Sequence, residues 1–392
     1  MKTLNSWMLL LSIPFTFLTC NTMKKPALDV AWTPSVCAPK DYPVMVISGV
    51  VTTGKVGGVP IMREFMNSSN WGEISGRHIS INSRSIPNGL GIRWYSYVEN
   101  KFYGGFFDLP VEKLTQLFAK RFVSMNGKKA NSSYNHVLVG MAPKGYVHVW
   151  LYGDGTVSEV GIFQAEEISM TLHEFDSHMW EAEEDQDAAL AEWRAEHLEE
   201  NKNADSLVRQ HVPIPDGLWK DKYREKFLSR VVFKYGDPNA LTDMYTVRYF
   251  NGEAEVLSGE ALKSNALQER PRFWQLIFKW SFGRELRKTF IYFDQAEMEA
   301  AYTRLYNGQS TDLACELRVD VNPENNFNRV YLQLQGAEYP KAIELLKADI
   351  GIYPLGEHSR FMFEAFADEF YVDGLGYYKR KDGRNPMDIN EE

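Results

Sequence analysis

Two short stretches contain residue types and spacings that could support ligand binding or catalysis. The first, GVVTTGKV from Gly49 to Val56, has the glycine and lysine spacing of a phosphate-binding loop. However, Val56 stands where a serine or threonine should hold magnesium. The second, HEFDSH from His173 to His178, places its histidines five residues apart, whereas one helix face requires four. We therefore predict a glycine-rich loop and a polar chain end, with no metal site and no cofactor.

Other catalytic patterns are also missing from the sequence. There is no GxSxG elbow of the kind that serine hydrolases use. Glu99 and Glu285 recur in equivalent contexts, but each stands beside a basic residue, Lys101 or Arg287. A cross-strand charge pair explains such acids more simply than catalysis does. The sequence predicts no catalytic residue and a protein that is not an enzyme.

The N-terminus, MKTLNSWMLLLSIPFTFLTCNTMKK, has the charged start and short apolar centre of a secretory signal peptide. The apolar run Trp7–Leu18 is shorter than the roughly 20 residues of a spanning helix. We predict a signal peptide over residues 1–19 and acylation of Cys20, although Thr19 departs from the small residues usual before a lipidated cysteine. The alternatives are an ordinary signal peptide that is cleaved elsewhere and a buried N-terminal segment. Asn21 gives no signal for inner-membrane retention, so we expect a lipid anchor on the periplasmic side of the outer membrane.

The composition indicates an exported globular body. The chain has 392 residues, 44% of them hydrophobic and 14% aromatic, with a net charge of −9. This is enough material for two cores, and an acidic chain without a basic stripe is a poor partner for nucleic acid. If Cys20 is acylated, Cys37 and Cys315 remain. They could form a disulfide in an oxidising compartment or stay as two separate buried thiols.

The middle of the chain repeats itself. Residues 90–108 and 276–294 carry tryptophan, glutamate, a basic residue, phenylalanine and aspartate at one constant separation, with Trp94 matching Trp280 and Asp108 matching Asp294. Each aspartate is a good N-cap for the helix-like segment that follows. In the first copy the helix should bury one face, formed by Val111, Leu114, Leu117 and Phe118.

Strand and turn signals follow each repeat. Strand–turn–strand patterns surround Pro143 and Pro323, and Asp154-Gly155 and Asn251-Gly252 are hairpin turns. The fold class is therefore α+β, with two related modules that each have an antiparallel sheet and a packed helix. We assign a signal peptide at 1–19, a tether at 20–37, the first module at 38–178, an acidic helical linker at 179–210, the second module at 211–378 and a polar tail at 379–392.

Two groups of residues are candidates for binding a partner. In the linker, Leu190, Trp193 and His197 form one narrow apolar stripe, and the acids could dock a basic partner or simply face water. In the first repeat, aromatic residues that point outward would be good contact residues, whereas core packing is their alternative role. The candidate residues are Trp94, Tyr95, Tyr97, Tyr103, Glu183, Glu184, Asp185 and Asp187.

The segments IPNGLGIRWYSYVENKFYGGFFDLP, VLVGMAPKGYVHVWLYGDG and EVGIFQA together resemble a bacterial lipoprotein family known as domain of unknown function 2931. The resemblance extends over much of the chain from about Tyr42 and is strongest in the first module. It implies a protein encoded near type VI secretion genes, often beside phospholipase effectors, and therefore an immunity role in which the protein binds and blocks a secreted lipase. No catalytic residues carry over from the family. A structural or assembly lipoprotein of the envelope is the alternative, and an unrecognised enzyme or a small-ligand sensor are further ones.

Overall fold

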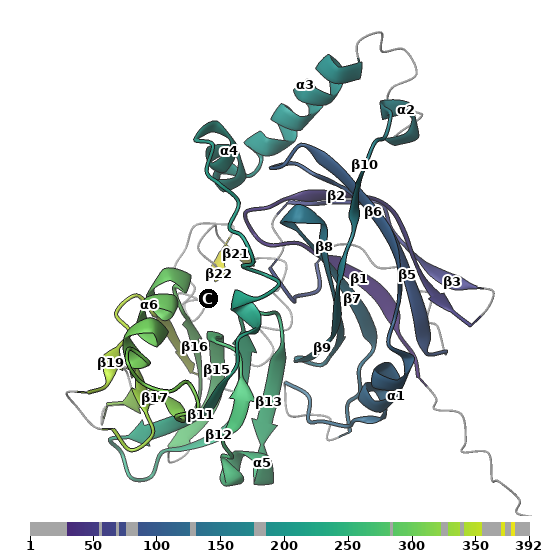
Figure 1. The fold of residues 1–392 in the computed structure, drawn as a ribbon. Coiled ribbons are helices and arrows are strands. Elements are labelled where there is room, and N and C mark those ends of the chain that lie inside the picture. Colours follow the sequence, from purple (N-terminus) through teal and green to yellow (C-terminus); the bar gives the residue numbers. More distant parts are fainter. Residues whose placement is uncertain are drawn as a thin grey trace, which may run out of the picture.

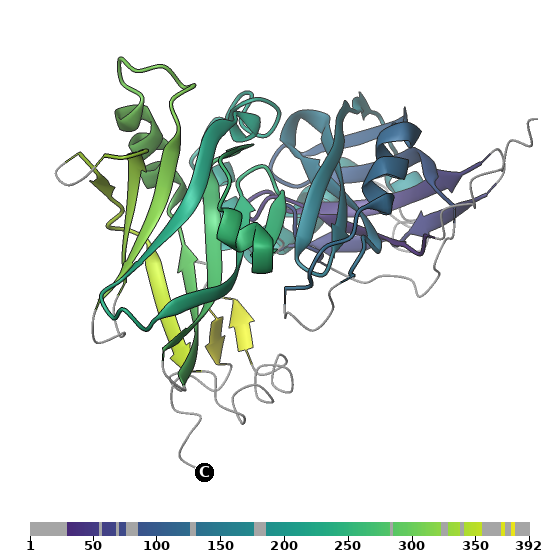
Figure 2. The same cartoon turned by 90° about the horizontal axis from the view of Figure 1, so that it is seen from below.

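In the computed structural model the chain forms two sheet-rich modules that lie side by side (Figures 1 and 2). The structure describes residues 30–54, 57–67, 70–75, 85–125, 131–175, 186–282, 285–322, 328–337, 341–354, 370–372 and 378–380. The predicted signal peptide, Cys20, the acids Glu183, Glu184 and Asp185, and residues 381–392 of the predicted tail lie outside the described residues.

The first module consists of two sheets and not one. A six-stranded sheet has the order β10-β6-β5-β2-β3, with β4 paired to β2. Against it lie four strands in the order β1-β7-β8-β9. The six-stranded sheet contains β2 (Val44–Thr53), β3 (Gly58–Ile61), β4 (Glu64–Met66), β5 (Pro87–Ser96), β6 (Lys101–Asp108) and β10 (Glu166–Ile168). The facing strands are β1 (Thr33–Cys37), β7 (His136–Ala142), β8 (Tyr146–Gly153) and β9 (Thr156–Gln164).

The second module repeats this arrangement. β11 pairs in parallel with β17, and β17 pairs with β18, as β1, β7 and β8 do in the first module. Likewise β12-β15-β16 follows the pairing of β2-β5-β6. The strands are β11 (Phe227–Tyr235), β12 (Leu241–Tyr249), β13 (Ala254–Ser258), β14 (Gln268–Arg270), β15 (Phe273–Phe282), β16 (Glu285–Tyr292), β17 (Cys315–Val321), β18 (Asn328–Leu334), β19 (Ile343–Glu344) and β20 (Asp349–Pro354). A separate pair, β21 (Phe370–Val372) and β22 (Tyr378–Arg380), extends into the start of the predicted tail.

The helices are few and short. They are α1 (Val111–Ala119), α2 (Leu172–Phe175), α3 (Gln186–Glu199), α4 (Lys202–Arg209), α5 (Gly259–Ser264) and α6 (Gln295–Leu305), with single 3-10 turns at Pro143–Gly145 and Lys222–Arg224. The fold is therefore α+β and mostly sheet, as the alternation of the sequence predicts.

The helices that follow the two repeats begin differently. Asp294 caps α6, because its carboxylate accepts a hydrogen bond of 2.8 Å from the Glu297 amide. Asp108 does not cap α1; it is the last residue of β6, and Pro110 precedes the helix without a side-chain cap. Leu114, Leu117 and Phe118 are buried as expected, but Val111 is exposed because it lies in the uncovered first turn.

The predicted tether is partly wrong. Trp32 is fully buried, and residues 33–37 form β1, which pairs with β7. A strand that is buried on both faces cannot be a flexible linker. Val30 is also buried, so residues 30–37 belong to the folded body of the first module.

The two modules share one sheet and one aromatic seam. Ala254 of β13 pairs with Val157 of β9, which joins strands of both modules into a nine-stranded sheet. At the seam, Trp150 packs edge-on against Trp71 with ring centroids 4.9 Å apart. The backbones of Gly72 and Gly252 approach so closely that a Cβ on Gly72 would lie 2.3 Å from Gly252. Side chains larger than hydrogen would push the modules apart here.

Candidate binding surface

The aromatic residues proposed as partner contacts are core residues. Trp94, Tyr95 and Tyr97 are fully buried, and Tyr103 is nearly so. Trp94 stacks on Tyr103 at 5.3 Å in the core between the two sheets of the first module. Tyr95 and Tyr97 point to the opposite face of β5, as alternation requires. The prediction of outward contacts is wrong because β5 is a central strand and both of its faces are covered at this end.

The acidic linker provides that cover. Trp193 of α3 lies over Tyr97, with ring centroids 5.1 Å apart. Arg194 donates to the backbone oxygens of Tyr97 and Val98 at 2.6 and 3.2 Å. The predicted stripe is confirmed for Trp193, and Asp187 lies exposed in the first turn of α3. The linker therefore belongs to the first module, and α2, α3 and α4 gather beside one end of its six-stranded sheet (Figure 1).

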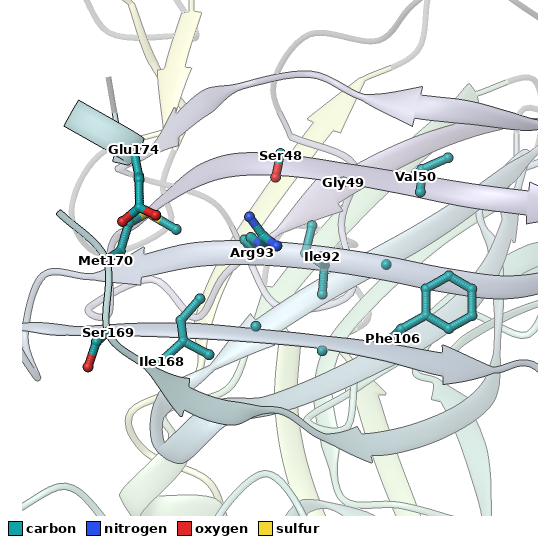
Figure 3. Close-up of a pocket in the computed structure, with 13 residues that line it drawn as sticks. Ser48, Gly49, Val50, Ile92, Arg93, Phe106, Ile168, Ser169, Met170 and Glu174 are labelled. Carbon is teal, nitrogen blue, oxygen red and sulfur yellow. The ribbon is translucent and has the colours of Figure 1, made fainter. Parts of the chain in front are cut away.

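Beyond α2 the same sheet face is open and forms a groove (Figure 3). Its volume is about 960 Å³. The groove lies over β2, β5 and β6, and the chain from β10 to α2 forms one wall. The side chains that line it are Ser48, Val50, Arg93, Phe106, Ile168, Ser169, Met170 and Glu174, while Ile92 borders the groove from β5 with its side chain in the core.

Glycines lower the floor of this groove. A Cβ on Gly91 would lie 3.2 Å from the Phe106 ring, and a Cβ on Gly104 would lie 3.0 Å from Ile168. Because neither strand carries a side chain there, the Phe106 ring rests on the backbone of β5. Phe106 nevertheless remains 63% exposed. A large apolar side chain that is packed on one side and exposed to solvent on the other is suited to contact a partner.

Arg93 supplies the positive charge in the groove. Its side chain is exposed and has no hydrogen bond or ion pair among the described residues. Glu174 is the acid that faces it, but the Glu174 carboxylate already accepts bonds from the Thr171 amide and hydroxyl at 2.8 and 3.0 Å. These bonds lower the pKa of Glu174, and the charge of Arg93 contributes less. Arg93 is thus available to a carboxylate from outside.

The groove lining offers binding groups and not a catalytic set. It contains two serines, one carboxylate and one guanidinium, with no histidine or cysteine to activate a hydroxyl. Within the described part of the chain no cluster of three or more metal-ligating residues occurs. His173 lies exposed on α2, while His178 is outside the described residues.

The other sequence candidates for chemistry have structural roles. The segment around Gly54 is the turn of the β2–β3 hairpin, with a positive φ of 64° and no helix after it. Glu99 does not pair with Lys101; it accepts hydrogen bonds from Ser96 and Tyr103 at 2.8 and 3.0 Å. Lys101 instead pairs with Glu167 at 2.6 Å.

Cys37 and Cys315 are free thiols and do not form a disulfide. Burial raises the pKa of Cys37 to about 12 and that of Cys315 to about 11. The Cys315 thiol also interacts with the hydroxyls of Tyr302 and Tyr306. Because the thiolate is the reactive form, we expect both cysteines to be unreactive in the folded protein.

Arg93 is not among the candidates that the sequence offers, whereas Phe106 is an outward-pointing aromatic of the first repeat, as the interface hypothesis requires, although it is not one of the named contact residues. Their signal is the alternation NGLGIR and YGGFF, in which glycines replace side chains on one face of neighbouring strands. That pattern leaves part of a sheet uncovered, but only the structure places both segments in one groove.

No helix in the described residues is long and apolar enough to cross a membrane.

A comparison with protein families matches the part of the chain that contains the groove. No curated protein and no solved structure matches the chain. One family model matches residues 19–217, just over half of the sequence, and so covers the first module, the linker and the whole groove. The chain therefore belongs to the family described as protein of unknown function (DUF2931).

Proposed function

We propose that this protein is a lipid-anchored envelope protein that acts by binding another protein, and that its partner is a phospholipase effector of type VI secretion. In this role it is an immunity protein, which blocks the lipase before the enzyme reaches the cell's own phospholipids. The signal-peptide pattern and Cys20 support an anchor on the periplasmic side of the outer membrane.

The observation that carries the proposal is the groove of the first module. It is open, contains an exposed aromatic ring and an uncommitted guanidinium, and has no nucleophile paired with a base. Those features suit stoichiometric binding better than turnover. The groove also lies within the part of the chain that defines the family.

The paired topology of the two halves supports an internal duplication. Equivalent strands pair in the same order in both modules, and the groove lies in the first module. We propose that the first module binds the partner and that the second stabilises it through the shared nine-stranded sheet.

A pull-down tests the proposal. Tagged protein with Cys20 intact is expressed in the periplasm together with a catalytically inactive form of the phospholipase encoded beside it. A one-to-one complex, and protection of cells from the active lipase, are the expected results. Recovery of envelope assembly proteins without the lipase would instead favour the structural role.

Attachment to the membrane is tested separately. The Cys20→Ala variant should leave the membrane fraction and appear in the soluble periplasmic fraction. If Cys20→Ala still fractionates with membranes, the lipid anchor at this residue is wrong.

A further inference from the structure

The groove side chains of β2, β5 and β6 stand in two rows across the sheet. In one row Ser48 pairs with Arg93, and Arg93 pairs with Gly104. In the next row Val50 pairs with Gly91, and Gly91 pairs with Phe106. Directly paired residues of an antiparallel sheet point to the same face, so both rows face the groove, as Figure 3 shows for Arg93 and Phe106.

The chemistry of the rows differs. The first row presents a guanidinium and a hydroxyl, and the second presents an aromatic ring and an aliphatic side chain over bare backbone. The rows are two residues apart along each strand, which is roughly 7 Å. An extended peptide places side chains on one face at the same repeat of roughly 7 Å.

We infer that the groove binds an extended segment of the partner protein in which an apolar residue and an aspartate or glutamate stand two positions apart. The apolar side chain packs against the exposed side of the Phe106 ring, in the row that also contains Val50. The carboxylate two positions away pairs with Arg93, which can hold it with two parallel hydrogen bonds. The inference rests on the proposed function, because the partner is taken to be the secreted phospholipase.

The acids near Arg93 limit how much negative charge the bound segment can carry. Glu174 lies at the α2 end of the groove, and its oxygens are engaged by Thr171. Glu166 of β10 pairs with Gly104 and is exposed in the same row as Arg93. These two acids would repel a second negative charge, so the geometry favours a segment with a single acid at this position and disfavours an acidic run.

The test measures binding of the inactive phospholipase to the mature protein and to two groove variants. Phe106→Ala removes the exposed ring, and Arg93→Gln removes the charge while keeping a similar length. Each variant should weaken binding about tenfold or more, because both act at the centre of the contact. Arg93→Glu should weaken binding further, because it adds a negative charge near Glu174 and Glu166.

Matched controls come from the second module. Leu346→Ala removes an apolar side chain that is 78% exposed, and Arg304→Gln neutralises an exposed arginine of α6. Both should bind like the unchanged protein. Circular dichroism of every variant separates loss of contact from loss of fold.

Overlapping peptides from the phospholipase then identify the segment. Peptides that compete with the intact enzyme should contain an apolar residue and one acid two positions apart, and changing that acid to its amide should abolish competition. If the unchanged protein does not bind the phospholipase, the proposed function fails and this inference fails with it. If it binds and the Phe106 and Arg93 variants bind equally well, only the inference is overturned.

Discussion

His148 gives a prediction about stability that can be worked out in advance. It lies in β8 at the seam between the modules, and its ring packs between Trp71 and Trp150 at centroid distances of 4.8 and 5.4 Å. The side chain is fully buried, and neither ring nitrogen has a hydrogen-bond partner among the described residues. Burial, with a smaller contribution from the positive charge of Arg224, lowers the pKa of His148 from 6.5 to about 3.

The sign of the pH effect follows from that shift. The folded protein keeps His148 neutral, while the unfolded chain binds a proton with an ordinary pKa near 6.5. Stability is therefore fully present above pH 6.5 and falls as the pH drops from 6.5 toward 3, because the unfolded state then binds more protons. Between pH 7 and pH 5 the loss from this residue is about 2 kcal/mol. The value changes little if the folded pKa is 4 and not 3, since both lie well below pH 5.

The His148→Leu variant tests this reasoning. Leucine has a similar volume and has no nitrogen atoms to leave unpaired, so it should be at least as stable as the original protein at pH 7. Urea unfolding followed by tryptophan fluorescence gives the free energy of unfolding at pH 7 and pH 5. The original protein should lose about 2 kcal/mol more than His148→Leu over that interval. His173→Gln, which removes an exposed imidazole on α2, is the control and should behave like the original protein. Equal losses in His148→Leu and the original protein would refute the assignment.

Three further predictions concern the packing and the cysteines. Trp193→Ala should lower the free energy of unfolding by about 3–5 kcal/mol and speed proteolysis within α3, because Trp193 packs the linker helix against Tyr95 and Tyr97. An unchanged urea midpoint would contradict this. Cys37 and Cys315 should react with a thiol reagent only after denaturation, because burial raises the pKa of both thiols; rapid labelling of the native protein would show that one is accessible. Asp294→Ala should cost about 1 kcal/mol through loss of the α6 cap, whereas Asp108→Ala should cost little, and thermal melts of the pair provide the comparison.

Local features of the fold could be predicted because their causes are local. Asp154-Gly155 forms the β8–β9 hairpin, with φ of 44° and 93° at the two residues, which are values that this turn type demands. The buried face of α1 follows from the spacing of Leu114, Leu117 and Phe118. The repeated order of strands and helix could be predicted for the same reason, since each element has its own pattern of apolar and polar residues.

The same logic failed where a residue's role depends on distant parts of the chain. Asp108 and Asp294 occupy equivalent places in the repeat, but only Asp294 reaches the backbone of its helix. The sequence alone allowed a disulfide between Cys37 and Cys315, but both are free thiols in the structure. Both thiols are buried in one extended hydrophobic cluster without bonding to each other, and no local pattern determines whether two such sites meet.

The sequence by itself determined the acidic character of the chain, its two sheet-rich halves and the alternation of β5. The tertiary structure alone decided which part of β5 is covered. Near Tyr95 and Tyr97 the strand lies under α2 and α3, while near Gly91 and Arg93 it is bare and forms the groove. The alternation of a strand fixes which side chains share a face, but the elements packed on that face come from elsewhere in the chain. Whether an aromatic or a charged residue is core or contact surface is therefore a property of the folded molecule.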